Sequence, residues 1–220
     1  MKHGIIFDCD GTLVDSLSQA LESFNHALAA VGEQPRSPEQ IKAYFGAGAD
    51  RILMRIIGDE AKGMEAFQHY VEHQSNLAGA TRLHKGVREL LDTLAEQGVP
   101  MAVVTGRHER DLQILLEPHQ LSEYFVTLIA DNHAPQSKPA PDGVLMAAER
   151  MGLEPEHTLY VGDAIYDLQA AHAAGSIPVA ALWDVLAKPD ELRAENPAFM
   201  AQTARELWPF FKQRWPLNHH

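Results

Sequence analysis

Hydrophobic residues along the chain fall into short continuous runs that alternate with stripes at helical spacing. The continuous runs predict buried strands at residues 4–7, 99–104, 124–129 and 158–162. The stripes predict helices at residues 87–97, 109–116, 141–151 and 165–174. A chain that alternates strand and helix in this way builds a doubly wound parallel sheet. We therefore expect an α/β fold with a Rossmann-like core.

The stretch between the first two strands is too long for a simple crossover. Helical patterns start at Leu17 and recur at residues 40–45, 50–57 and 59–77, with no strand pattern between them. We expect an inserted helical cap domain over residues 16–80, called the helical insert below. The core then consists of residues 1–15 and 81–220, and the insert lies over its ligand-binding edge.

The first predicted strand runs directly into a glycine turn that carries two carboxylates. Asp8 and Asp10 follow Phe7, and Gly11 gives the freedom that a tight turn needs. Because side chains alternate along a strand, both acids can face one side while Cys9 packs on the other. Two carboxylates that close repel each other unless a divalent cation or a proton lies between them. An acidic turn at a strand end is the alternative interpretation.

Polar residues follow the other predicted strands in the same way. They are Thr105, Gly106 and Arg107 after the second strand, Lys138 after the third, and Asp163 and Asp167 after the fourth. Parallel sheets bind ligands beyond the carboxyl ends of their strands, so these segments meet in one place. Taken singly, each has a simpler explanation as a strand end, a solvated lysine or a helix start. Together with the first acidic motif, they predict one catalytic cleft.

A glycine-rich loop within the helical insert is a candidate for substrate binding. Gly46 and Gly48 precede a predicted helix that carries Arg51 in its first turn. Backbone amides at such a helix start, together with a guanidinium, can bind an anion. A plain turn between two helices explains the glycines equally well.

Composition narrows the class of partner. The chain has 220 residues and a formal charge of -12, which disfavours a general nucleic-acid or membrane binder. It has one cysteine, and Asp8 comes after only a few apolar residues, so we expect neither a disulfide nor a signal peptide. We expect a cytoplasmic protein, a monomer or a dimer, that acts on a small molecule. His219 and His220 are either native or the remnant of a purification tag.

The four motifs, in this order, resemble those of the haloacid dehalogenase superfamily, in its phosphatase branch with a helical cap after the first strand. They read Asp8-Cys9-Asp10-Gly11-Thr12, Thr105-Gly106-Arg107, Lys138-Pro139, and Gly162-Asp163 followed by Asp167. The resemblance covers nearly the whole chain. In this superfamily, phosphatases and phosphomutases carry an aspartate two residues after the nucleophile, whereas dehalogenases lack it. Asp10 therefore favours phosphoryl transfer.

The resemblance implies a role for each motif. Asp8 would attack phosphorus and form an aspartyl phosphate, while Asp10 would protonate the leaving oxygen and later activate water. Mg²⁺ would be held by Asp8, the carbonyl group of Asp10 and Asp163, with indirect support from Asp167. The implied contacts to the phosphoryl group and the rest of the substrate come from Thr105, Gly106, Arg107 and Lys138. Gly106 stands where asparagine is frequent and Ala164 where serine or threonine is frequent, but neither departure removes a metal ligand.

Two other classes of protein share parts of this pattern. His69 and His73 flank Glu72 in the arrangement of inverted zinc peptidases, but chance explains so short a match and no third ligand is marked. A phospho-receiver module also combines acidic residues, a hydroxyl residue and a Lys-Pro pair. It places its phosphorylated aspartate on a later strand, however, and has no helical insert.

The sequence therefore predicts a Mg²⁺-dependent phosphatase for a small phosphorylated metabolite, with phosphoglycolate, sugar phosphates and pyrophosphate as candidates. A β-phosphoglucomutase-like phosphomutase is the alternative within the superfamily, because it shares all four motifs. We expect the core to perform the chemistry and the helical insert to select the substrate, with Arg51 holding a second anionic group.

Overall fold

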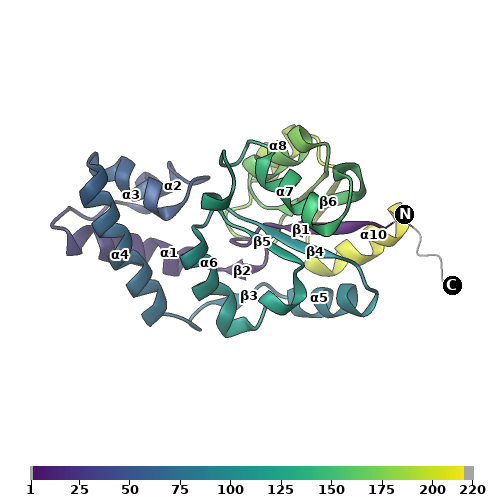
Figure 1. Ribbon diagram of the computed structural model, residues 1–220, viewed down its shortest axis with the longest axis horizontal. Coiled ribbons are helices and arrows are strands. Elements are labelled where there is room, and N and C mark those ends of the chain that lie inside the picture. Colours follow the sequence, from purple (N-terminus) through teal and green to yellow (C-terminus); the bar gives the residue numbers. More distant parts are fainter. Residues whose placement is uncertain (1, 216–220) are drawn as a thin grey trace.

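The computed structural model describes residues 2–215, and a six-stranded parallel sheet forms its centre (Figure 1). The strand order is β5-β4-β1-β6-β7-β8, so the N-terminal strand lies inside the sheet. The strands are β1 (Gly4–Phe7), β4 (Met101–Val104), β5 (Thr127–Ile129), β6 (Thr158–Gly162), β7 (Ile177–Ala181) and β8 (Phe199–Ala201). All neighbouring strands run parallel, which confirms the predicted doubly wound fold. His219 and His220 lie outside the described residues.

Helices cover both faces of this sheet (Figure 1). Because side chains alternate along β1, Ile5 and Phe7 pack with the helices of one face and Ile6 with those of the other. The first face carries α5 (Val87–Glu96), α6 (Glu109–Leu116) and α10 (Leu207–Arg214), and the second carries α7 (Asp142–Met151), α8 (Ile165–Ala174) and, beside α8, α9 (Pro189–Ala194). Burial on both faces explains why the strands read as continuous apolar runs.

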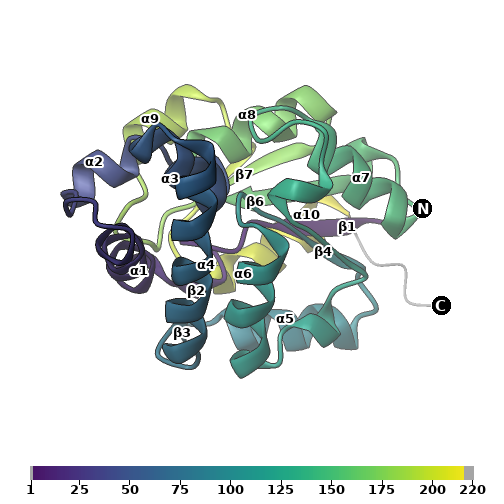
Figure 2. The same ribbon diagram turned by 60° about the vertical axis from the view of Figure 1, so that its left-hand side comes forward.

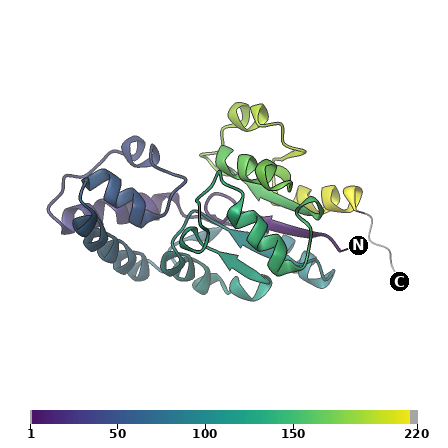
Figure 3. The same ribbon diagram turned by 45° about the horizontal axis from the view of Figure 1, so that its top comes forward.

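The helical insert stands apart from the sheet, on the left in Figures 1 and 3. Its helices are α1 (Leu17–Ala30), α2 (Pro38–Lys42), α3 (Ala49–Ile57) and α4 (Glu60–Asn76). Their apolar faces meet in a separate cluster around Phe24, Leu53 and Phe67. Ile114 of α6 packs against that cluster, and Figure 2 shows α4 beside α6. The insert thus has buried side chains of its own and meets the core along α6.

A small antiparallel ladder joins the two passages between the core and the insert. It pairs β2 (Val14–Asp15) with β3 (Arg82–Leu83). Val14 lies opposite Leu83, and His84 extends the contact by donating its backbone N–H to the carbonyl oxygen of Leu13 at 3.0 Å. The chain therefore leaves the core and returns to it at one point.

Local capping signals set the boundaries of the insert helices. Ser37 caps α2 in a reciprocal capping box with Gln40, which starts this helix earlier than the predicted range of 40–45. Gly58 adopts the left-handed conformation that ends α3, and Asp59 then accepts the backbone N–H of Lys62 to begin α4.

The four predicted strands are all present, although β5 begins at Thr127 and not at residue 124, and two more strands follow them. The sequence pattern did not predict β7 or β8; β7 contains Pro178 and ends in two alanines, which are weak strand formers. Short 3₁₀ turns complete the core at Glu117–His119, Ser122–Tyr124, Asp131–His133, Pro155–His157 and Ala204–Glu206. Within residues 2–215, no helix is long and apolar enough to cross a bilayer.

Candidate active site

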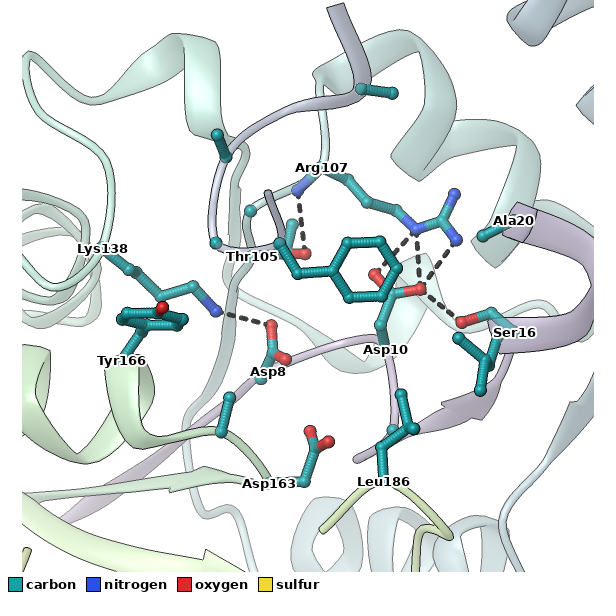
Figure 4. A pocket seen from close by; sticks show the side chains of 18 of the residues that line it. Asp8, Asp10, Ser16, Ala20, Thr105, Arg107, Lys138, Asp163, Tyr166 and Leu186 are labelled. Atoms are coloured by element: carbon teal, nitrogen blue, oxygen red, sulfur yellow. Dashed lines mark hydrogen bonds and ion pairs between the residues drawn. The ribbon is translucent and has the colours of Figure 1, made fainter. Parts of the chain in front are cut away.

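The polar side chains at the strand ends line one cavity of about 180 Å³ between the sheet and the helical insert (Figure 4). The core contributes all its candidate residues to the lining: Asp8, Asp10, Thr105, Gly106, Arg107, Lys138, Asp163 and Asp167. The insert contributes Gly46 and mostly apolar side chains, namely Leu17, Ala20, Phe24, Phe45, Ala47, Ala49 and Ile52. The fold thus brings four distant segments of the chain to one place.

Asp8 follows β1 and is almost fully buried, with 6% of its surface exposed. Its Oδ1 accepts a hydrogen bond of 3.0 Å from the ammonium group of Lys138. Burial raises the pKa of Asp8 to about 7, and the nearby carboxylates of Asp167 and Asp10 act in the same direction, while Lys138 opposes them. Lys138 therefore does not supply enough positive charge to offset the burial of the Asp8 carboxylate.

Lys138 links Asp8 to a second buried carboxylate, Asp167. Its ammonium group lies 2.5 Å from Asp167 Oδ1, which also accepts the hydroxyl of Tyr160 at 3.1 Å. The other oxygen of Asp167 accepts the backbone N–H of Ala164 at 3.0 Å. Burial alone would lower the pKa of Lys138, but Asp167 and Asp8 outweigh burial and raise it well above its ordinary value. Lys138 is therefore a fixed cation between two acids.

Asp8, Asp163 and Asp167 form a cluster in which one oxygen from each lies within 4.8 Å of the others. Burial raises the pKa of Asp163 well above its ordinary value, and Asp8 and Asp167 add to this effect. Thr12 donates its hydroxyl to Asp163 Oδ1 at 3.1 Å. Hard carboxylate oxygens with too little compensating charge are a donor set that fits Mg²⁺. Because both oxygens of Asp167 already accept hydrogen bonds, Asp8 and Asp163 are the better direct ligands.

Gly11 allows the first motif to approach the fourth closely. Its φ is +70°, and a Cβ added there would lie 2.3 Å from Asp163 Oδ2. No side chain fits in that space, and this φ is itself unfavourable for other residues. The glycine therefore lets the turn and Asp163 occupy adjoining positions.

The carboxylate of Asp10 lies apart from this cluster and pairs with Arg107 (Figure 4). The guanidinium donates from Nε to Oδ2 at 2.8 Å and from Nη2 to Oδ1 at 2.7 Å, and the hydroxyl of Ser16 also donates to Oδ1. Burial alone would raise the pKa of Asp10, but Arg107 and Ser16 outweigh it and lower the pKa. The expectation that both acids of the turn share one ligand through their side chains is therefore not met.

Thr105 and Gly106 stand beside Asp8 at the end of β4. Thr105 is 3% exposed, and its hydroxyl oxygen accepts the backbone N–H of Arg107 at 3.2 Å. Gly106 comes close to the glycine-rich loop of the insert, because a Cβ on it would lie 3.6 Å from the carbonyl oxygen of Gly46. The second motif therefore touches both the catalytic end of the core and the insert.

Arg51 of the insert has partners in the core instead of facing the cavity. Its Nη1 donates to the hydroxyl of Ser137 and lies 3.5 Å from Asp131 Oδ2. Asp131 also accepts the backbone N–H of Gly48 at 3.2 Å. Neither Arg51 nor Gly48 lines the cavity, whereas Gly46 does, next to the ring of Tyr166. The glycine-rich loop thus docks on the core beside the site.

Several residues at the site were not predicted from the sequence. Asp111 is 1% exposed and accepts a hydrogen bond of 2.6 Å from Arg107 Nη1. Its spacing of four residues from Arg107 was a signal for such a pair. Ser16 and Asp184 also line the cavity, but nothing in their local sequence distinguishes them from ordinary turn residues.

The remaining sequence features have structural roles. Cys9 is fully buried in the core, as predicted, and burial raises the pKa of its thiol. His73 shares a hydrogen bond of 2.9 Å with the hydroxyl of Ser23 and stacks on His26. Within the described residues, the group with metal-ligand spacing is the carboxylate cluster. The His69–His73 pattern of a zinc peptidase therefore has no support from the geometry.

Comparison with known proteins matches residues 5–181 to the family of haloacid dehalogenase-like hydrolases. The chain belongs to this family. The resemblance to this family seen in the sequence is therefore confirmed. This family membership disfavours both alternative classes, the phospho-receiver module and the zinc peptidase.

Individual relatives agree with this assignment. Phosphoglycolate phosphatase 1 of Pseudomonas aeruginosa is 33% identical over 215 residues, covering 93% of this chain and 78% of that protein. A phosphoglycolate phosphatase of Mannheimia succiniciproducens is 36% identical over 187 residues, covering 79% of this chain and 82% of that protein. The crystal structure of a predicted phosphoglycolate phosphatase from Haemophilus somnus 129PT has a TM-score of 0.81 at 26% identity, covering 95% of this chain and 97% of that chain.

Proposed function

We propose that this protein is a Mg²⁺-dependent phosphatase that hydrolyses a small phosphorylated metabolite, with phosphoglycolate as the first candidate. The observation that carries the proposal is the buried cluster of Asp8, Asp163 and Asp167 beside Lys138, at the carboxyl ends of the strands. The names of the relatives support phosphate ester hydrolysis. The cavity of about 180 Å³ suits a small ester and not a polymer.

Asp8 is the proposed nucleophile. A carboxylate oxygen attacks phosphorus, the bond from phosphorus to the ester oxygen breaks, and an aspartyl phosphate forms. Water then attacks the same phosphorus, and the bond to Asp8 breaks to release phosphate. Lys138, 3.0 Å from Asp8, neutralises charge on the transferring group, and Thr105 and Gly106 supply donors for its oxygens.

Asp10 is the proposed proton-transfer group. Because Arg107 lowers its pKa, Asp10 is ionised in this arrangement and suited to accept a proton from the attacking water. Protonation of the leaving oxygen needs the opposite state of the same carboxyl group. The contact with Arg107 must therefore loosen while the ester oxygen departs.

The residues that would hold Mg²⁺ are Asp8 and Asp163, with the backbone carbonyl group of Asp10. Asp167 would act through Lys138, since its oxygens already accept hydrogen bonds. The ion would supply positive charge to the phosphoryl oxygens and to the acids whose pKa values are raised. We also propose residues 16–80 as a cap domain; a cytoplasmic location and a monomer or dimer remain predictions.

A turnover screen tests the proposal. Purified protein is assayed with phosphoglycolate, several sugar phosphates, pyrophosphate and an aryl phosphate, with phosphate release and sugar isomerisation both measured. We expect phosphate release that stops with a chelator and returns with Mg²⁺ but not with Zn²⁺, because the ligands are hard oxygens. Sugar isomerisation without net phosphate release would instead identify the phosphomutase, and no reaction with any ester would refute the proposal.

A further inference from the structure

Positive charge is scarce in the cavity. Its described lining contains six carboxylates, Asp8, Asp10, Asp111, Asp163, Asp167 and Asp184, against two cations, Lys138 and Arg107. Lys138 is held by Asp8 and Asp167 at 3.0 and 2.5 Å, so it serves the phosphoryl end of the site. A substrate with a second anionic group has Arg107 as the available cation among these lining residues.

The helical insert offers no alternative cation at this surface. The residues that it places in the lining are apolar, with the exceptions of Gly46, Ser16 and Tyr70. Arg51, which the sequence suggested for this role, contacts Ser137 and Asp131 outside the cavity lining. The selection of anionic substrates therefore falls to the core.

Arg107 keeps free donors in spite of its two partners. A guanidinium has five N–H groups in a fork that matches a carboxylate. In Arg107, Nε and one N–H of Nη2 serve Asp10, and one N–H of Nη1 serves Asp111 at 2.6 Å. One N–H on each terminal nitrogen remains without a protein partner among the described residues, and the side chain lines the cavity. These two donors are available to an anionic group of a substrate.

Asp111 fixes the orientation of this fork. It is 1% exposed and lies outside the carboxylate cluster that fits a metal. The chemistry proposed for Asp8 and Asp10 does not use it. A buried carboxylate costs free energy unless it is paired, and its pairing with Arg107 offsets that cost. Asp111 therefore holds Nη1 in place and prevents the guanidinium from turning entirely toward Asp10.

Tyr70 connects this pair to the helical insert. It lies on α4, is 2% exposed, and is close enough to Asp111 for each group to influence the pKa of the other. Its hydroxyl accepts the side-chain amide of Gln74 at 3.2 Å, and Gln74 in turn bonds Ser23 at 3.1 Å. Buried polar groups thus extend from the interior of the insert to the pair of Arg107 and Asp111.

We propose that Arg107 recognises a second anionic group on the substrate, and that Asp111 and Tyr70 are positioning residues that hold its guanidinium at the cavity wall. This inference rests on the proposed phosphatase function. In this proposal, a residue of the core determines the preference for a doubly anionic ester. The insert influences that preference through Tyr70.

The experiment compares two esters that differ in one charge. The kcat/KM of phosphoglycolate is divided by that of 2-hydroxyethyl phosphate, which has a hydroxymethyl group in place of the carboxylate. A disturbance of Asp10 lowers kcat/KM for both esters, so the ratio reports recognition of the substrate carboxylate. Arg107→Gln should reduce the ratio by about 10- to 100-fold, the range of a charge-assisted hydrogen bond. Arg107→Lys should retain part of the ratio, since it keeps the charge without the fork.

Other variants test the positioning roles. Asp111→Asn should raise KM for phosphoglycolate more than it lowers kcat, and Tyr70→Phe should change the ratio least of these variants. Arg51→Gln is the matched control, an arginine outside the cavity lining, and should keep the ratio within about twofold. A lowered Tm with an unchanged ratio in Asp111→Asn would make Asp111 a purely structural residue and overturn its positioning role.

The outcomes separate this inference from the proposed function. A wild-type ratio near one, or a ratio that survives Arg107→Gln, overturns recognition by Arg107 while phosphatase activity stands. If Arg107→Gln does not fold, an unchanged ratio in both Arg107→Lys and Asp111→Asn also overturns recognition by Arg107. A wild-type protein that releases phosphate from no ester refutes both the proposed function and this inference.

Discussion

The core wall of the cavity carries charged and hydroxyl side chains such as Asp8 and Lys138, whereas the insert wall consists mainly of apolar side chains such as Phe24 and Ile52. Hydrogen bonds fix the core side chains, and these bonds depend strongly on distance and direction. Packing within a separate apolar cluster fixes the insert side chains, and packing tolerates swaps of similar volume. Reactivity therefore depends on the core wall, and the shape of the cavity depends on the insert wall.

The largest effect is expected on the core wall, from Asp8→Asn. An amide cannot replace the attacking carboxylate, so phosphate release should fall by more than about a thousandfold. The fold should persist, because loss of a buried acid also removes repulsion from Asp163 and Asp167. Phosphate release is measured alongside Tm. Substantial turnover by a preparation free of host phosphatases would remove Asp8 from the mechanism.

A matched change on the insert wall should act mainly on stability. Ile52 is 3% exposed and belongs to the apolar cluster of the insert. Ile52→Ala should lower the free energy of unfolding by about 2–5 kcal/mol, through lost burial and the cavity left behind. Denaturant unfolding and kcat are measured together. If folded Ile52→Ala lost as much kcat as Asp8→Asn, the insert wall would also take part in the chemistry, and the contrast between the two walls would be wrong.

The charge imbalance of the core wall predicts a pH-dependent response to metal. Burial raises the pKa of Asp8 to about 7 and also raises that of Asp163. The folded protein then keeps protons that the unfolded chain has lost. Without metal, the free energy of unfolding should therefore fall as pH rises from about 4, the ordinary carboxyl value, toward neutrality.

Mg²⁺ should restore this lost stability, and more strongly at pH 8 than at pH 5. The measurement is Tm with Mg²⁺ or with a chelator at both values. Asp163→Asn is the control; it should show a smaller metal effect, because one of the repelling carboxylates is gone. Equal shifts at the two pH values would mean that these acids do not face the ion.

The smallest effect is expected at Arg51, where the insert contacts the core beside the cavity. Its side chain is 39% exposed and lies 3.5 Å from Asp131, so the pair contributes less than about 1 kcal/mol. Arg51→Gln should reduce kcat/KM modestly and by the same factor for phosphoglycolate and for an aryl phosphate. A selective loss of phosphoglycolate turnover would instead return substrate selection to the insert.

The core wall could be predicted well from the sequence, because parallel strands place their carboxyl ends at one edge of a sheet. Asp8, Thr105, Lys138 and Asp163 each follow a strand and meet as expected. The partners of these side chains could not be predicted. Arg107 reaches Asp10 across 97 positions of sequence, and such a contact depends on tertiary packing and side-chain conformation.

Arg51 illustrates the opposite case. A guanidinium beside two glycines at a helix start is chemically suited to an anion, yet here it contacts Ser137 and Asp131. Nothing near Arg51 in the sequence indicates those partners, which lie on a loop of the core far along the chain. The partner Asp111 was missed as well, although it lies only four residues from Arg107 and this spacing was a usable signal.

Gly11 and Gly32 share a positive φ but differ in what surrounds them. At Gly32, with φ of +75°, no atom lies within 4 Å of an added Cβ, so asparagine, which tolerates this conformation, fits there. At Gly11, even a methyl group would collide with Asp163. Gly32 can therefore be replaced by another residue, whereas Asp163 leaves no space for any side chain at Gly11. A saturation library would separate two glycines that the backbone alone makes look equivalent.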